Sequence, residues 1–138
     1  MHKDINNLAL LMHNLFKSMA DLHERQLESF DVTKKHIPFL MLLGKQKEGL
    51  TQPEITGKLN FDKGHISRTL RELKNKGYVE KIGDTSYKNK FVITEKSNEI
   101  IKLIKEENQK IVTRVSEVLS EDEIKAFEST IKKIIDVI

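Results

Sequence analysis

Residues 62–77 are the stretch that most constrains what this chain can fold into. At helical spacing, Ile66 and Leu70 fall on one side of a helix, whereas Arg68 and Arg71 fall close to the opposite side. The apolar side suits a protein core, and the basic side suits a negatively charged partner. The pattern therefore predicts an amphipathic helix that presents cations to solvent. A plain solvated face is the alternative to a binding face.

Both ends of this predicted helix carry suitable capping residues. Asp62 is a good N-cap because its carboxylate accepts hydrogen bonds from the free N–H groups of the first turn, and Gly77 stands where a C-terminal cap belongs. Gly64 costs about 1 kcal/mol relative to alanine inside a helix, and its missing side chain would allow close approach of another surface. Because helices in the major groove of DNA read bases with their N-terminal turns, we interpret this segment as a DNA recognition helix.

A short helix is predicted immediately before the recognition helix. Thr51 and Glu54 have the spacing of a capping box, and Pro53 occupies the first turn. Ile55 and Leu59 supply an apolar side. Two short helices joined by a tight connection predict a helix-turn-helix arrangement.

A β-hairpin is predicted after the recognition helix. Residues 78–82 and 90–93 are rich in β-forming residues, and turn-forming residues separate them. The hairpin would be the wing of a winged helix, with Lys88 and Lys90 at its tip. These lysines could follow a phosphate backbone or enter a minor groove, and a surface loop without such contacts is the alternative.

The remaining segments are predicted to be helices. Residues 4–28 carry a long apolar stripe, and a second helix starts near Thr33. Thr94 can cap the helix after the wing, and a capping box of Ser120 and Glu123 opens the last helix. Because a lone winged-helix lobe cannot cover so much apolar surface, we expect the terminal helices to pack against a second copy of the chain. An intramolecular three-helix bundle is the alternative.

Composition and charge narrow the classes of function. The formal charge is +3, and residues 60–96 hold nine basic against five acidic residues, which is the footprint of a phosphate-binding surface. The chain has no cysteine, its five histidines lack metal-ligand spacing, and its glycines form no phosphate loop. We therefore expect no enzyme, metal or cofactor. The absence of a signal core and of a membrane-length apolar run predicts a cytoplasmic protein that is not in a membrane.

Four segments of the chain carry a family resemblance. They are Leu50-Thr51, Asp62-Lys63-Gly64-His65-Ile66-Ser67-Arg68-Thr69-Leu70, Leu73-Lys74-Asn75-Lys76-Gly77-Tyr78-Val79 and Ile93-Thr94-Glu95-Lys96. In these segments and in its order of elements the chain resembles the MarR family of bacterial and archaeal transcription regulators. The resemblance implies a mainly α fold with a small β-hairpin (α+β). It also implies a single domain over residues 1–138, with dimerisation helices in residues 1–30 and 97–138 and a winged helix-turn-helix lobe in residues 34–96.

The resemblance also implies a function. The protein would be a sequence-specific, double-stranded DNA-binding regulator of transcription, a repressor that acts as a homodimer on a pseudo-palindromic operator, and small aromatic or anionic effectors could release it. A winged-helix module for protein–protein interaction, without specific DNA binding, is the alternative. The implied DNA surface comprises Thr51, Gln52, Lys63, Gly64, His65, Ser67, Arg68, Arg71, Lys88 and Lys90.

The chain also departs from the family pattern. Thr85 and Tyr87 stand where the family's wing commonly carries Asp and Arg, so the usual minor-groove contact would fall to Lys88 or Lys90. Lysine fits less well where a planar bidentate group is needed. Ser97 stands where the family usually has Gly, a difference that we expect to matter little.

Overall fold

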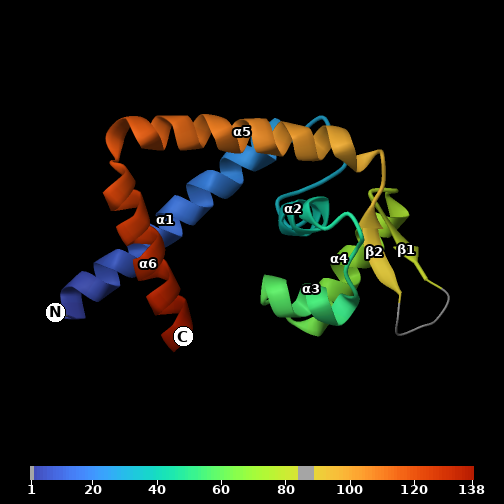
Figure 1. Ribbon diagram of the computed structural model, residues 1–138, viewed down its shortest axis with the longest axis horizontal. Coiled ribbons are helices and arrows are strands. Elements are labelled where there is room, and N and C mark those ends of the chain that lie inside the picture. The colour runs from blue at the N-terminus through green and yellow to red at the C-terminus, as the bar shows by residue number, and fades with distance from the viewer. Residues whose placement is uncertain (1, 84–88) are drawn as a thin grey trace. The chain divides into compact units, whose positions relative to one another are not determined.

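The computed structural model describes residues 2–83 and 89–138 (Figure 1). The elements in chain order are α1 (His2–Gln26), α2 (Ile37–Lys45), α3 (Gln52–Leu59), α4 (Lys63–Asn75), β1 (Val79–Ile82), β2 (Lys90–Ile93), α5 (Ser97–Val118) and α6 (Glu121–Val137). The predicted fold class, mainly helical with one small hairpin, is confirmed. The chain divides into two compact units, residues 1–104 and residues 105–138, and the boundary falls inside α5.

Helix α4 begins and ends where its sequence predicts. The Oδ1 atom of Asp62 accepts a hydrogen bond from the N–H of His65 at 2.8 Å, which makes Asp62 the N-cap. At the other end, Gly77 adopts a left-handed φ of 83°, and the N–H of Tyr78 donates to the carbonyl of Leu73 at 2.9 Å. This is the hydrogen bond of a Schellman cap, for which a residue without Cβ is favoured.

The capping box predicted for α3 forms only in part. The Oγ1 atom of Thr51 accepts a hydrogen bond from the N–H of Glu54 at 3.3 Å. Between these two described residues, no bond from the Thr51 N–H to the Glu54 carboxylate accompanies it. Ser120 and Glu123 make both bonds at the start of α6, so that capping box is confirmed.

Helix α2 begins later than the sequence predicts. The segment from Thr33 forms a separate turn, in which the Thr33 carbonyl accepts from the His36 N–H at 3.0 Å and the Thr33 N–H donates to Nδ1 of His36 at 3.0 Å. The helix proper starts at Ile37, with Pro38 in its first turn. The connection from α1 is therefore closed locally by His36.

Helix α5 also begins later, at Ser97, because Thr94 has another role. The Thr94 hydroxyl donates to the carbonyl of Gly77 at 2.5 Å, and so it ties the end of β2 to the cap of α4. Ser97 is fully buried, and its hydroxyl donates to the carbonyl of Tyr78. The serine at this position thus joins the start of α5 to the start of the hairpin.

Strands β1 and β2 form an antiparallel pair in which Val79 lies opposite Ile93 and Ile82 opposite Lys90. Leu50 extends this pairing: its N–H donates to the Phe91 carbonyl at 3.1 Å, and its carbonyl accepts from the Phe91 N–H at 2.7 Å. This bridge holds the residue before the α3 N-cap against the hairpin, as in a winged helix.

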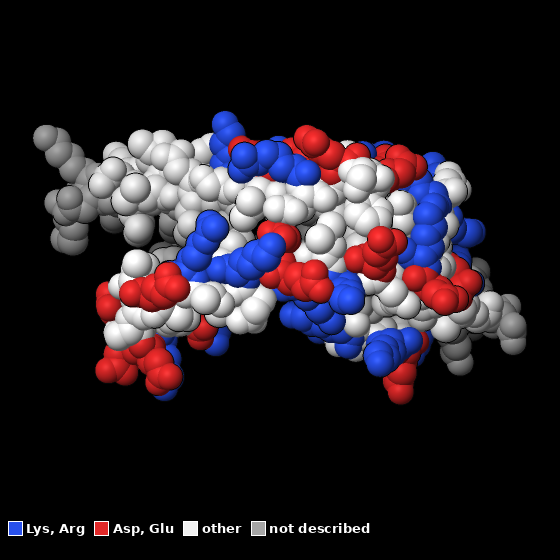
Figure 2. Space-filling model, turned by 90° about the horizontal axis from the view of Figure 1, so that it is seen from above, with Lys and Arg blue, Asp and Glu red and all other residues white. Residues whose placement is uncertain are grey.

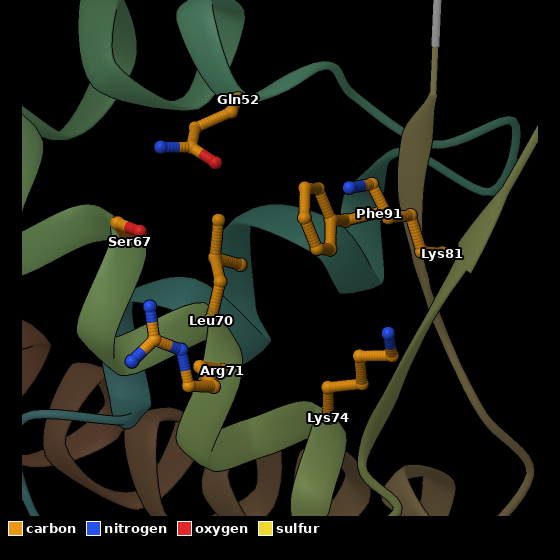
Figure 3. Close-up of a pocket in the computed structure, with 7 residues that line it drawn as sticks. All are labelled: Gln52, Ser67, Leu70, Arg71, Lys74, Lys81 and Phe91. Atoms are coloured by element: carbon orange, nitrogen blue, oxygen red, sulfur yellow. The ribbon is translucent and has the colours of Figure 1, made fainter. Parts of the chain in front are cut away.

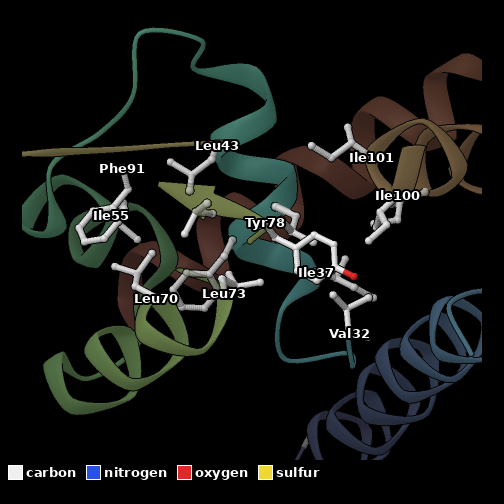
Figure 4. Close-up of a cluster of buried hydrophobic side chains, with 14 of the residues drawn as sticks. Val32, Ile37, Leu43, Ile55, Leu70, Leu73, Tyr78, Phe91, Ile100 and Ile101 are labelled. Atoms are coloured by element: carbon white, nitrogen blue, oxygen red, sulfur yellow. The ribbon is translucent and has the colours of Figure 1, made fainter. Parts of the chain in front are cut away.

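One hydrophobic core holds the first unit together (Figure 4). Its fully buried side chains come from the segment before α2, from α2, α3, α4 and β1, and from the first turns of α5, and they include Phe39, Ile55, Leu73, Val79 and Ile100. The apolar side predicted for the recognition helix lies in this core, so the helix presents its opposite side to solvent.

The terminal helices α1 and α6 are packed differently from the lobe. Apolar side chains of α1 are exposed to between 36% and 58% at Leu8, Leu10, Leu11, Leu15, Phe16 and Met19. Helix α6 has no buried residue. None of the described helices has the length and hydropathy needed to cross a membrane.

Candidate nucleic-acid interface

Helix α4 directs its basic side chains to solvent. Lys63, Arg68 and Arg71 are all exposed on it, and its first turn is also open at Gly64. The structure therefore exposes these predicted residues on α4, with Lys63, Gly64 and Arg68 in its N-terminal half and Arg71 one turn further along. The N-terminal half is the one with which a recognition helix contacts base edges.

The space beside Gly64 is used by Arg68. A Cβ atom on Gly64 would lie 3.0 Å from a terminal guanidinium nitrogen of Arg68 and 3.2 Å from Oδ1 of Asp62. Arg68 thus folds back along the first turn toward the N-cap. The N–H of His65 and then the nearby charge of Arg68 hold the pKa of Asp62 below its usual range. The missing side chain of Gly64 therefore leaves room for the guanidinium of Arg68, and not only for the approach of another surface.

A cationic pocket of about 210 Å³ lies between α3, α4 and the hairpin (Figure 3). Helix α3 contributes Gln52 to the lining, and the two strands contribute Lys81 and Phe91. Helix α4 contributes the other four lining residues, Ser67, Leu70, Arg71 and Lys74. Among the residues that the structure describes, no acidic side chain belongs to this lining. An arginine and two lysines around one small pocket suit a phosphate or another anion.

Lys74 and Lys81 belong to this pocket, although the sequence reasoning did not assign them to the DNA surface. Lys74 lies one helical turn after Arg71, so helical spacing could have identified it. Lys81 is brought in by the strand register, in which it pairs with Phe91, and its Nζ lies 5.7 Å from the centroid of that ring. A register across a hairpin is not visible in local sequence.

A second, less polar pocket of about 320 Å³ lies at the N-terminal ends of α3 and α4. Gln52, Pro53, Thr56 and Lys63 line it. Gln52 lines both pockets, and Thr51 immediately precedes it as the N-cap of α3. The predicted residues of α3 therefore lie next to those of α4.

His65 occupies a different environment from its neighbours. Its ring lies 4.6 Å from the ring centroid of Phe61 and 6.2 Å from that of Phe39. Its Nε2 atom is buried, and no described group forms a hydrogen bond with it. This geometry favours packing of the ring at the start of α4, and a DNA contact by His65 stays a prediction.

The wing is described only in part. Lys88, Thr85 and Tyr87 lie outside the described residues, so the contacts expected of the wing tip stay predictions. Lys90 is the first residue of β2, is half-buried and lines neither pocket. The basic residues that line the two pockets therefore come from α4 and β1.

The charge of the protein is unevenly distributed. On the face shown in Figure 2, Lys and Arg side chains alternate with Asp and Glu side chains, without an extended patch of one sign. In contrast, the lining of the cationic pocket carries Arg71, Lys74 and Lys81. Local charge at the pocket is therefore a better guide to a partner than the net charge of +3.

Comparison with known proteins agrees with this fold. The sequence matches the MarR family model over residues 30–86, which include α2, α3, α4 and β1. No curated protein matches the chain.

Solved structures of MarR family proteins are similar over almost the whole chain. A MarR protein from Peptoclostridium difficile is 20% identical, with a TM-score of 0.82 and coverage of 94% of this chain and 86% of that one. Staphylococcus aureus MepR in complex with DNA is 20% identical, with a TM-score of 0.79 and coverage of 94% and 96%. A MarR transcriptional regulator from Methanosarcina mazei is 18% identical, with a TM-score of 0.77 and coverage of 94% and 87%. These structures share the fold of this chain, and the resemblance stated from the sequence is confirmed.

Proposed function

We propose that this MarR family winged-helix protein binds double-stranded DNA sequence-specifically and regulates transcription. The observation that carries the proposal is the solvent-facing side of α4, where Arg68 and Arg71 are exposed beside the cationic pocket. The known DNA complex of S. aureus MepR, which has the same fold, supports it.

Different residues of this surface suit different parts of DNA. Arg68 and Arg71 project from the helix that would enter the major groove, where arginine pairs with the O6 and N7 atoms of guanine. Lys74 and Lys81, together with the N-terminus of α3 at Gln52, suit phosphate oxygens, which fix the register of a protein on DNA without reading the sequence. Lys88 and Lys90 on the wing would add further backbone or minor-groove contacts.

The proposed active form is a homodimer on a pseudo-palindromic operator. Leu8, Leu11 and Leu15 follow one another at helical spacing on α1 and are all more than 40% exposed. Phe127 on α6 is 48% exposed in the same manner. Exposed apolar stripes of this kind mark protein interfaces, and a two-fold dimer would place two recognition helices on two half-sites.

The regulator would act as a repressor that a small effector releases. A dimer bound across a promoter would compete with the transcription machinery for the same DNA. Release by a small aromatic or anionic compound follows from the family resemblance. If an effector binds the protein more tightly off DNA than on it, its addition must lower the affinity for the operator by the same coupling factor. Titrating benzoate, a simple anionic aromatic compound, into the protein–operator complex tests this part, and an unchanged affinity would argue against release by this class.

Selection of bound sequences from random duplex DNA tests the function directly. We expect two related half-sites at a fixed spacing. Arg68→Ala or Arg71→Ala should weaken binding to the selected site by about 1–3 kcal/mol for a side chain that contacts a base edge. Lys102→Ala, which removes an exposed positive charge from α5, is the matched control.

Two results would contradict the proposal. One is a set of selected sequences without any shared motif. The other is a double Arg68→Ala, Arg71→Ala variant that keeps full specific affinity. A protein-interaction module could bind DNA through its basic face, but it would show no preference for one duplex. A specific DNA-binding protein keeps its preference for one duplex while its affinity falls steeply with salt.

A further inference from the structure

The outer side of the recognition helix is tied to the connection between α1 and α2. We define this connector as residues 27–36. The Oε2 atom of Glu72, on α4, lies 2.9 Å from Nζ of Lys35 and 2.9 Å from Nε2 of His36. One helical turn later, Nζ of Lys76 donates to Oδ1 of Asp31 at 2.6 Å. The connector thus contacts α4 at Glu72 and at its C-cap residue, Lys76.

His36 is the buried member of this contact. The residue is 1% exposed, whereas the side chains of Lys35 and Glu72 are 46% and 40% exposed. Nδ1 of His36 accepts the N–H of Thr33 at 3.0 Å, so this nitrogen carries no proton. The proton of the neutral ring is therefore on Nε2, which donates to Glu72. Both ring nitrogens therefore form hydrogen bonds, Nδ1 as an acceptor and Nε2 as a donor.

A second proton on the ring would break this arrangement. The new N–H at Nδ1 would face the N–H of Thr33, donor against donor. The Thr33 hydroxyl lies 3.5 Å from Nδ1 and could accept the new proton only after the turn that precedes α2 rearranges. Burial lowers the pKa of His36, although the hydrogen bond and charge of Glu72 raise it; Lys35 and Lys76 lower it further. Asp31 also faces this group, next to Lys76.

Small displacements of α4 matter because Glu72 is next to Arg71. The two side chains leave the helix in different directions, Glu72 toward the connector and Arg71 into the cationic pocket. A recognition contact needs its side chain within about 0.5 Å of the productive geometry. A contact that holds Glu72 therefore also holds the position of Arg71.

We propose that His36 is a positioning residue for DNA binding: in its neutral form it locks α4 to the connector through Glu72, and its protonation releases this lock and weakens binding to the operator. The proposal rests on the proposed function, and it names acid as a regulator of the same surface. Because the connector follows directly from α1, the lock also joins the recognition helix to a proposed dimer helix.

The test compares affinity for the selected duplex at pH 7.5 and pH 5.5, at constant salt, for wild type and His36→Gln. Glutamine places its side-chain N–H₂ near the position of Nε2 and can still donate to Glu72, but it does not titrate. We expect wild type to lose roughly three- to tenfold in affinity at pH 5.5, because a histidine whose pKa is lowered in the locked state opposes that state once it is protonated. His36→Gln should bind more weakly than wild type at pH 7.5, because it offers no acceptor to the N–H of Thr33, but it should lose clearly less of its own affinity between pH 7.5 and pH 5.5.

His13→Gln is the matched control, because His13 is an exposed histidine on α1. It should keep the pH dependence of wild type. Equal pH dependence in wild type and His36→Gln, with specific binding intact, would overturn the positioning role and leave the proposed function standing.

A readout without DNA separates the two proposals. In ¹⁵N–¹H spectra of the free protein, Nδ1 of His36 should be unprotonated at pH 7.5, and the amide signals of α4 around Glu72 should shift together with the titration of His36. A proton on Nδ1 at pH 7.5 would contradict the lock itself, and so would α4 amide signals that do not shift as His36 titrates. If wild type bound no duplex at pH 7.5, the proposed function would fail, and with it the claim that the lock controls DNA binding.

Discussion

Phe39 in α2 and Phe127 in α6 are the same residue type on amphipathic helices, yet Phe39 is fully buried and Phe127 is 48% exposed. The difference extends to their surroundings. Phe39 lies in a core that α2, α3, α4 and the hairpin share, whereas α6 has no buried residue at all. The lobe thus contains the partners for its own apolar side chains. The exposed apolar residues of the terminal helices are the physical basis for proposing a dimer.

The largest expected effect is on the free energy of unfolding, which alanine substitutions of these two phenylalanines should change differently. Phe39→Ala should lower the free energy of unfolding by about 3–5 kcal/mol, because it removes a fully buried ring and leaves a cavity. Phe127→Ala should instead change stability in a manner that depends on protein concentration, because its ring would be buried only in a dimer. Chemical denaturation at two protein concentrations measures both, and equal, concentration-independent losses would erase the distinction.

The next effect concerns the exposed stripe of α1. Leu15→Asp should weaken self-association by more than about 2 kcal/mol, because it buries an unpaired carboxylate in the proposed interface. Light scattering should then give a mass near 16.0 kDa for the variant and near twice that value for wild type at micromolar concentration. Lys17→Asp is the control for added negative charge, since Lys17 is a charged, exposed residue of the same helix. A monomeric wild type would refute the dimer.

A smaller effect compares helix caps in the two regions. Asp62→Ala and Ser120→Ala each remove a side-chain acceptor from the first turn of a helix, so each should cost about 1 kcal/mol. Asp62→Asn keeps an acceptor and should cost less. The loss from Asp62→Ala should shrink in acid, because the lowered pKa of Asp62 gives stability that is present above its ordinary pKa and lost as pH falls below it. Urea denaturation at neutral and acid pH measures this, and a pH-independent loss would argue against the charged cap.

The smallest expected effect is the acid dependence of the contact at Glu72. Hydrogen bonds from Lys35 and then His36 lower the pKa of Glu72 to about 2. A carboxylate with a lowered pKa contributes stability that is present above its ordinary pKa of 4.5 and is lost as pH falls toward 2. Glu72→Gln should therefore flatten the stability profile between these pH values, as measured by urea denaturation. Because the side chain is 40% exposed, we expect this change to be smaller than that of a cap, and an unaltered profile would contradict the pairing.

Local signals in the sequence predicted much of the fold. The caps at Asp62 and Gly77, the β-forming residues of both strands and the capping box at Ser120 depend on residues within a few positions of one another. Such interactions are set by neighbours along the chain, so the sequence displays them. The order of helices and the exposed basic side of α4 follow from the same kind of pattern.

The parts that the sequence did not reveal depend on distant contacts. His36 and Glu72 meet across the fold, so nothing near either residue indicated that His36 would close the turn before α2. Lys81 reaches the cationic pocket through its register opposite Phe91. His65 lies at the edge of the basic side of α4, where the rings of Phe61 and Phe39 decide its environment. A helical projection shows which residues share a side of α4, but it does not show which aromatic rings from other segments pack against that side.

The central claim is that the exposed side of α4 reads a specific DNA sequence. Its most direct test is the ratio of affinities for the selected duplex and for a shuffled duplex of the same composition, measured at constant salt for wild type and for Arg71→Ala. We expect a ratio of at least about 10³ for wild type and a loss of roughly five- to 150-fold for the variant on the selected duplex, with a much smaller loss on the shuffled one. A ratio near one for wild type, or equal losses on both duplexes, would contradict the claim.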